Sequence, residues 1–242
     1  MSAAAPSCGR SFSPQYFWAR VPAGAVQDCL REVFAVWGLP EAVRVDNGSP
    51  WGSWSDLPPL LALWLVGCAI DMVWNDPCRP QQNGVVERSQ GTGQRWAEPG
   101  SCPSAAVLQQ RLDEADWLQR SAYPYRQGHS REEVWPQLRH SGRPYTPAWE
   151  EEHWSLTRVR QHLAGYAVPR RVDRTGNVSL YDRNCYVGVR HRGRTVWVMF
   201  DPNTGEWVIA DEHGQQLRSR PAELIRAETI RQLPGSRAEE RL

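Results

Sequence analysis

The expected fold depends on two short stretches, V-R-V-D-N-G (43–48) and N-D-P-C-R-P-Q-Q-N-G-V-V-E-R (75–88). The first predicts a short apolar strand that ends in an acid, Asp46, directly before an Asn-Gly turn pair. The second predicts a polar loop that runs through another Asn-Gly pair into a helix, with Glu87 in the first helical turn. Sheets of α/β proteins carry their chemistry at strand carboxyl ends, and carboxylate oxygens suit hard cations. The two acids are therefore candidate metal ligands.

In their order and spacing, these stretches resemble the second half of the DDE (Asp-Asp-Glu) catalytic core of insertion-sequence transposases and retroviral integrases. The residues that carry the resemblance are Phe34, W-G-L-P (37–40), V-D-N-G (45–48) and R-P-Q-Q-N-G-V-V-E-R (79–88). The resemblance implies an α/β ribonuclease H-like (integrase core) fold. It also implies that Asp46 and Glu87 are catalytic residues that hold Mg²⁺ or Mn²⁺.

The start of the chain departs from that family. There the core begins with three antiparallel strands, and the first strand carries a metal-binding aspartate that bridges two ions. Here one strand, over residues 15–21, is predicted before the first helix, and residues 1–23 contain no acid. Asp28 falls among packing residues of that helix and is not assigned as the missing ligand. We therefore expect an N-terminally incomplete core with an incomplete two-ion site.

The loop and helix around Glu87 approach DNA in the family. The residues expected to contact DNA there are Asn83, Arg88, Gln90, Gln94 and Arg95. The candidate site residues also have plainer explanations. Asp46 is a residue type that forms turns, Glu87 is a favourable acid at a helix N-terminus, and the polar face of the helix can simply face solvent.

Composition and periodicity divide the chain into five expected regions. These are an unstructured N-terminus (1–14), a partial integrase core (15–122), a helical connector (123–165), a small all-β SH3-like barrel (166–225) and a polar tail (226–242). Expected core helices cover 24–37, 57–66, 85–96 and 105–118, with strands at 43–46 and 69–74. In the connector, one helix is expected from Glu150 to Leu163. Short β-rich runs at 167–172, 178–181, 184–189, 195–200 and 206–211 predict the barrel.

Charge indicates what the expected barrel binds. The whole chain has a formal net charge of +1 and contains no lysine, but residues 156–200 hold nine arginines against two acids. A concentrated basic region with exposed aromatics is typical of surfaces that bind nucleic-acid phosphates. The residues expected to contact DNA are Arg170, Arg171, Arg190, Arg192 and Arg194. The alternative is an ordinary solvated surface.

Other features exclude several classes of protein. The most apolar run, 57–66, is too short to span a membrane and contains two prolines, and residues 1–10 lack the order of a signal peptide. The six scattered cysteines form no C-x-x-C pair, so we expect reduced thiols and a cytoplasmic protein, associated with the nucleoid when it binds DNA.

Three functions follow from the sequence. The first is a DDE-type transposase or integrase of a mobile element, which cleaves and transfers strands of double-stranded DNA at element ends and target. It is expected to be truncated and catalytically impaired alone, and to act as a homo-oligomer or together with a full-length transposase. The second is a catalytically inactive DNA-binding derivative that regulates or joins an intact transposase. The third is a ribonuclease H-like nuclease or interaction module with another cellular role.

Overall fold

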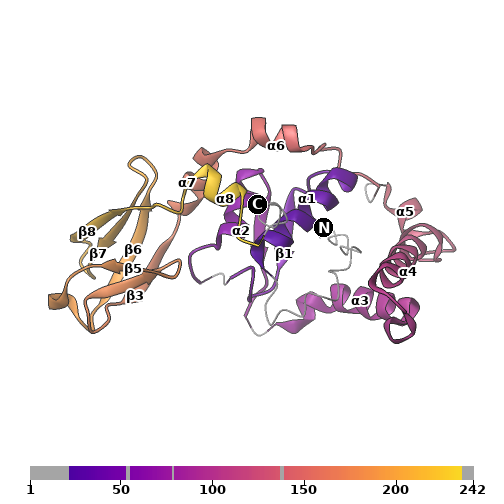
Figure 1. Cartoon of the computed structure of the whole chain (residues 1–242), viewed down its shortest axis with the longest axis horizontal. Helices are drawn as coiled ribbons and strands as arrows, with labels where there is room; N and C mark the ends of the chain where they lie inside the picture. The colour runs from indigo at the N-terminus through magenta and orange to yellow at the C-terminus, as the bar shows by residue number, and fades with distance from the viewer. Residues whose placement is uncertain (1–21, 53–54, 78, 137–138, 236–242) are drawn as a thin grey trace. The chain divides into compact units, whose positions relative to one another are not determined.

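The structure is a computed structural model that describes residues 22–52, 55–77, 79–136 and 139–235 (Figure 1). It is a mixed α/β protein. Its helices are α1 (Ala23–Trp37), α2 (Leu60–Gly67), α3 (Gly84–Ala97), α4 (Ala105–Trp117), α5 (Arg131–Val134), α6 (Pro147–His153), α7 (Leu156–Leu163) and α8 (Ala227–Arg231). Its strands are β1 (Ala42–Val45), β2 (Asp71–Trp74), β3 (Ala167–Arg171), β4 (Asn177–Leu180), β5 (Arg183–Tyr186), β6 (Thr195–Asp201), β7 (Glu206–Ala210) and β8 (Gln216–Pro221). Shorter helical turns are η1 (Pro80–Asn83), η2 (Pro99–Ser101), the π-helical η3 (Leu118–Ala122) and η5 (Val189–His191).

The described residues form two compact units. The first unit holds those of Met1–Asp46, Val73–Glu152 and Pro234–Leu242, and the second holds those of Asn47–Met72 and His153–Leu233. Each unit is therefore assembled from stretches that are far apart in the sequence.

In the first unit, α1 is fixed by its C-terminus and by a buried ion pair. Gly38 ends the helix at φ +75°, a conformation that favours glycine, and an added Cβ would lie 2.7 Å from the Arg143 carbonyl oxygen. On the helix itself, the Arg31 guanidinium donates to both carboxylate oxygens of Glu150 in α6, at 3.0 and 2.8 Å. The hydroxyl of buried Tyr145 donates to the same carboxylate. This network joins α1 to α6.

In the second unit, α2 is a core helix. It is apolar all round, and five consecutive residues, Leu61–Leu65, are at most 1 % exposed. The helix packs against α7 and α8. Trp154 supports this packing, because its indole N–H donates to the Trp64 carbonyl oxygen at 3.0 Å. The expected polar tail (226–242) is structured at its start, because Ala227–Arg231 form the helix α8, whose Ile230 is fully buried.

The second unit also contains the β-rich segment. Four strands pair antiparallel in the order β3-β6-β7-β8, and β4 and β5 form a separate hairpin. All five expected strands are confirmed. The alternation along β6 is also as expected: Val196, Val198 and Phe200 are at most 4 % exposed, whereas Trp197 is 39 % exposed. One strand, β8, was not predicted.

Outside the β-rich segment, most predicted elements are confirmed, and one is wrong. The helices at 24–37, 85–96 and 105–118 and the strands at 43–46 and 69–74 correspond to α1, α3, α4, β1 and β2. The expected helix from Glu150 to Leu163 is instead divided into α6 and α7. Ser155 causes the division, because its hydroxyl caps α7 and its N–H donates to the Gly67 carbonyl oxygen at 3.0 Å.

Two further expectations concern the ends and the cysteines. The strand expected at 15–21 lies outside the described residues. Cys29 is disulfide-bonded, which corrects the expectation of reduced thiols for that residue, whereas Cys102 and Cys185 are free thiols. Within the described ranges, no helix is both long and apolar enough to cross a membrane.

Candidate nucleic-acid interface

Asp46 lies where the sequence predicts it. It directly follows β1 and its side chain is exposed. The chain then turns at Gly48, whose carbonyl oxygen accepts the N–H groups of Trp51 and Gly52 at 2.7 and 2.8 Å. Asp46 therefore stands at the carboxyl end of a strand, beside a hydrogen-bonded turn.

Glu87 also lies where the sequence predicts it, in the first turn of α3, with its side chain exposed. The loop before this helix is closed by a reciprocal pair: the Asp76 N–H donates to Gln82 Oε1 at 2.8 Å, and Gln82 Nε2 donates to Asp76 Oδ2 at 3.0 Å. This pair ties Asp76 to η1, directly before α3.

Two exposed carboxylates are the candidate donors for a divalent ion. Asp46 and Glu87 supply hard oxygen atoms, which Mg²⁺ prefers. Among the residues that the structure describes, no group of three or more His, Cys, Asp or Glu side chains is placed to hold a metal ion. In general, a pair of divalent ions needs more protein ligands than two carboxylates supply, whereas a single Mg²⁺ keeps several waters and takes few protein ligands.

The residues of α3 that were expected at DNA are polar and accessible. Arg88, Gln90, Gln94 and Arg95 are all exposed. Arg95 is partly engaged within its own helix, because its guanidinium donates to the Gly91 carbonyl oxygen at 3.2 Å. Asn83 is the last residue of η1, directly before α3.

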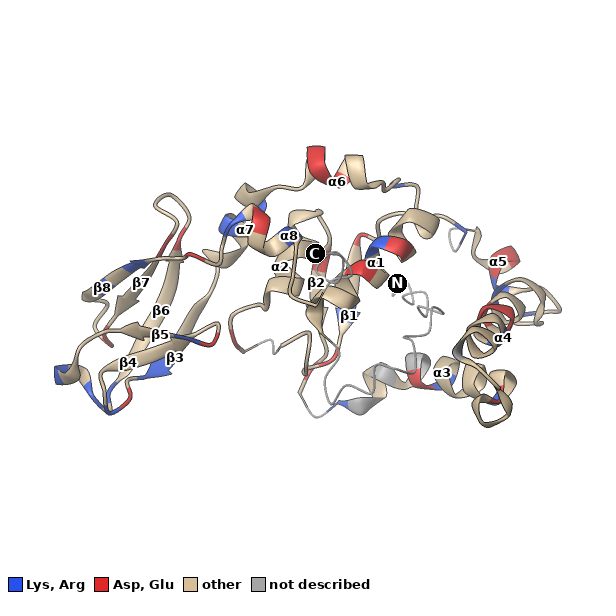
Figure 2. Cartoon of the chain, in the orientation of Figure 1, with Lys and Arg blue, Asp and Glu red and all other residues tan. Residues whose placement is uncertain are grey.

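Five exposed arginines gather at one end of the second unit, and we call them the arginine cluster. They are Arg171, Arg174, Arg190, Arg192 and Arg194. Backbone hydrogen bonds bring their segments together: Val172 N–H donates to the Arg194 carbonyl oxygen, and Gly193 N–H donates to the Val172 carbonyl oxygen, both at 2.9 Å. Figure 2 shows the basic residues of this end in blue. The cluster combines the end of β3 with two loops.

A single acid orders one loop of the cluster. The Asp173 carboxylate accepts hydrogen bonds from the Thr175 N–H and hydroxyl, both at 2.8 Å, and from the Asn177 N–H at 2.9 Å. The Asn177 N–H is the main cause of the lowered pKa of Asp173, and the Thr175 hydroxyl adds to it. The Asp173 carboxylate is therefore ionised and orders this loop. Its single negative charge offsets only part of the positive charge of the five arginines.

Arg170, which was also expected at DNA, is engaged within the protein. Its guanidinium forms an ion pair with Asp56, in the loop before α2, and donates to the Ser179 carbonyl oxygen at 3.3 Å. The hydroxyl of Tyr181 donates to the Pro58 carbonyl oxygen of the same loop at 2.7 Å. Burial raises the pKa of Tyr181, so this hydroxyl stays a donor. These contacts fix residues 56–58 against the β-rich segment.

Two further exposed arginines of this unit were not predicted as site residues. Arg218 and Arg220 lie on β8, opposite Ile209 and Trp207 of β7, and both are exposed. The signal was present in Q-L-R-S-R-P (216–221), where the basic residues recur with the period of a strand. These arginines lie outside residues 156–200, where the arginines are most concentrated.

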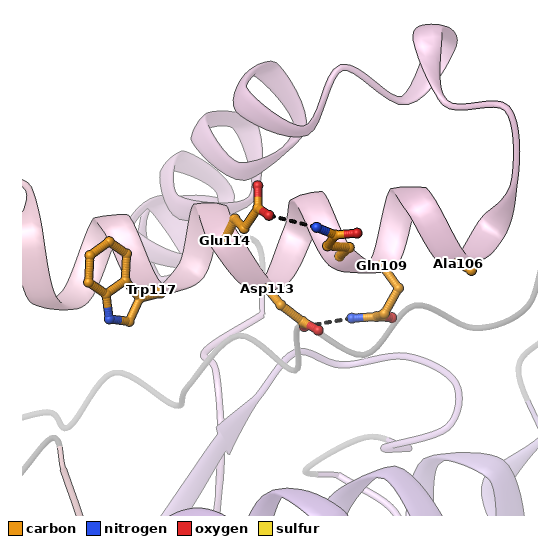
Figure 3. A pocket seen from close by; sticks show the side chains of 6 residues that line it. Ala106, Gln109, Asp113, Glu114 and Trp117 are labelled. Carbon is orange, nitrogen blue, oxygen red and sulfur yellow. Dashed lines mark hydrogen bonds between the residues drawn. The ribbon is translucent and has the colours of Figure 1, made fainter.

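A shallow pocket lies elsewhere, on one face of α4, and includes none of the expected site residues (Figure 3). Its polar side chains satisfy one another: Gln109 donates to Asp113 at 2.7 Å and Gln110 donates to Glu114 at 3.0 Å. These are ordinary pairs one helical turn apart, and they indicate no bound ligand.

The comparisons with known proteins give a weak likeness. No protein-family model matches the chain. A solved chain from the structure described as "CryoEM structure of simian T-cell lymphotropic virus intasome in complex with PP2A regulatory subunit B56 gamma" is similar, with 16 % identity and a TM-score of 0.39. The match covers 83 % of this chain and spans 63 % of that chain.

Proposed function

We propose that this protein binds double-stranded DNA through the arginine cluster, as a transposase- or integrase-type protein of a mobile element. The observation that carries the proposal is the gathering of five exposed arginines from β3 and two loops at one end of a unit, with one acid among them. Guanidinium groups bind phosphate oxygens in a bidentate manner, and neutralising several phosphates releases counterions from the duplex. This surface therefore suits a nucleic-acid backbone.

The test compares two double variants that remove the same charge. Arg192→Gln with Arg194→Gln removes part of the cluster, and Arg126→Gln with Arg139→Gln removes two exposed arginines of the first unit. We expect the cluster variant to weaken binding to a labelled duplex by about 10–100-fold, and the slope of log Kd against log salt to fall by about 1.8. Fluorescence anisotropy over a salt series measures both quantities.

The control variant, Arg126→Gln with Arg139→Gln, distinguishes a specific interface from a general effect of net charge. If it weakens DNA binding as much as the cluster variant, the effect is one of net charge and the cluster is not the interface. If the unaltered protein binds no duplex, the proposed function is wrong.

As a second candidate function, we propose metal-dependent cleavage and transfer of DNA strands by a ribonuclease H-like core, with the β-rich segment as an SH3-like barrel. The specific support is that Asp46 directly follows β1 and Glu87 lies in the first turn of α3, both with exposed carboxylates. These two residues would hold one Mg²⁺ or Mn²⁺, and an ion there supplies charge stabilisation for phosphoryl transfer. Oligomerisation, or assembly with a full-length transposase, belongs to the same proposal.

Metal binding can be tested apart from catalysis. We expect Asp46→Asn and Glu87→Gln each to weaken Mn²⁺ binding by about tenfold or more, because each removes a charged ligand. Electron paramagnetic resonance of the free and bound Mn²⁺ measures this affinity. Glu98→Gln, at a carboxylate that is 70 % exposed, is the matched control and should leave binding unchanged. Equal Mn²⁺ affinity in all four proteins would remove these residues from a metal site.

Cleavage of labelled duplex in Mn²⁺ then separates the two functions. Nicking that both site variants lose supports the nuclease and strand-transfer function. Salt-sensitive DNA binding without cleavage supports the inactive, DNA-binding derivative.

A further inference from the structure

The strand β8 creates a second basic surface on the second unit. Arg218 and Arg220 are exposed on it, separated by one residue, and therefore lie on the same side of the strand. In the described part of the chain, neither forms an ion pair with a carboxylate, whereas Arg183 nearby in the hairpin pairs with Glu223 at 2.8 Å. Both guanidinium groups of β8 thus remain available to an anion. Figure 2 shows the basic residues of β8 in blue.

An aromatic side chain joins these arginines. Tyr186, at the end of β5, is 42 % exposed. The Arg218 guanidinium lies over its ring, 5.9 Å from the centroid, an arrangement that holds the ring and the cation together. The charges of Arg218 and Arg220 both act on the neighbouring Cys185, whose pKa is nevertheless raised by burial. The two arginines therefore border the β4–β5 hairpin at Tyr186 and Cys185.

This surface adjoins the arginine cluster. The ring of Tyr186 lies against the loop after β3, because a Cβ added to Gly176 would be 3.0 Å from it. The backbone of the same glycine accepts hydrogen bonds from the Val187 and Gly188 N–H groups at 2.8 and 3.0 Å. Tyr186 consequently lies between the loop that carries Arg174 and the strand that carries Arg218.

The chemistry of the two surfaces differs. The cluster offers charge alone, which any nucleic-acid backbone satisfies. Tyr186 offers an exposed ring, and a base in a duplex has no free face with which to stack on it. A base that is unpaired has such a face, and an aromatic ring next to arginines is the usual arrangement for single-stranded nucleic acid.

We propose that Tyr186, Arg218 and Arg220 bind unpaired nucleotides next to the duplex that the arginine cluster holds. Tyr186 stacks on a base, and the two arginines contact the phosphates beside it. The inference rests on the proposed function, since it gives the same unit a preferred DNA substrate: a duplex with a single-stranded extension.

The test uses the full chain and two labelled probes, a blunt duplex and the same duplex with an overhang of about five nucleotides. We expect the unaltered protein to bind the overhang probe more tightly than the blunt one. Tyr186→Leu, which keeps an apolar side chain of similar reach, should weaken overhang binding by about tenfold, the effect of losing one stacked base, and leave blunt binding unchanged. Tyr186→Phe keeps the ring and should retain the preference, and Arg218→Gln with Arg220→Gln should reduce it.

The outcomes separate this inference from the proposed function. If blunt duplex binds but the overhang adds no affinity, or if Tyr186→Leu weakens both probes equally, the inference is overturned and duplex binding stands. If the unaltered protein binds neither probe, both are overturned. Circular dichroism melts of each variant check that folding is retained, as expected for exposed positions.

Discussion

Replacing Glu150 with alanine is expected to lower the free energy of unfolding of the first unit by about 3 kcal/mol. The Glu150 side chain is 4 % exposed, and it is bound in a bidentate manner by Arg31. Its removal leaves a guanidinium without its buried partner and the Tyr145 hydroxyl without its acceptor. Because Arg31 retains 27 % exposure and a second pair with Asp28, the cost falls at the lower end of the range for buried pairs.

Urea denaturation followed by tryptophan fluorescence measures this change. Glu151→Ala is the matched control, since it removes an exposed glutamate from the next position of the same helix and should cost no more than about 0.5 kcal/mol. Glu150→Gln, which keeps an acceptor but not the charge, should fall between the two. Equal midpoints for the two alanine variants would show that the ion pair contributes nothing to stability.

The second large effect is expected from Gly67→Ala, at the end of α2. An added Cβ would lie against the indole of Trp154, 2.8 Å from Cδ1 and closer still to Nε1. Because Trp154 is 9 % exposed and its N–H is bonded to the Trp64 carbonyl oxygen, the ring cannot move without breaking that bond. Overpacking of this kind, with the lost hydrogen bond, should cost about 3 kcal/mol.

Gly91→Ala is the control for that substitution. Gly91 lies within α3, where an added Cβ meets nothing within 4 Å. Alanine favours a helix over glycine, so this variant should gain up to about 1 kcal/mol. Thermal and urea unfolding of both variants measures the difference, and a Gly67→Ala protein as stable as the unaltered one would contradict the packing of Trp154 on α2.

The elements that the sequence predicts are those with strong local signals. The stripe of apolar residues in α1 and the alternation along β6 each arise within one short segment, so the sequence alone locates them. The break between α6 and α7 depends on the Gly67 carbonyl oxygen, which accepts from Ser155 far along the chain. A periodic pattern does not contain that partner, and the single helix expected there was wrong.

The candidate site residues also differ in whether a local sequence signal locates them. Asp46 and Glu87 are placed by a strand end and a helix start, and both positions agree with the sequence. Charge alone, in contrast, does not tell which arginine faces solvent. Arg170 and Arg171 are neighbours in sequence, yet one is paired with Asp56 and the other is exposed, because successive strand residues point to opposite faces.

The contacts of Arg170 and Tyr181 also decide where this protein can be divided. The loop at 56–58 and helix α2 come from early in the chain, yet they complete the unit that carries β3 to β8. A fragment excised at residue 166 would leave the Tyr181 hydroxyl without the Pro58 carbonyl and Arg170 without its carboxylate. It would also lack α2 and α7, with their buried apolar side chains. The β-rich segment is therefore not a detachable module, and dissection of the chain has to keep residues 47–72 together with 153–233.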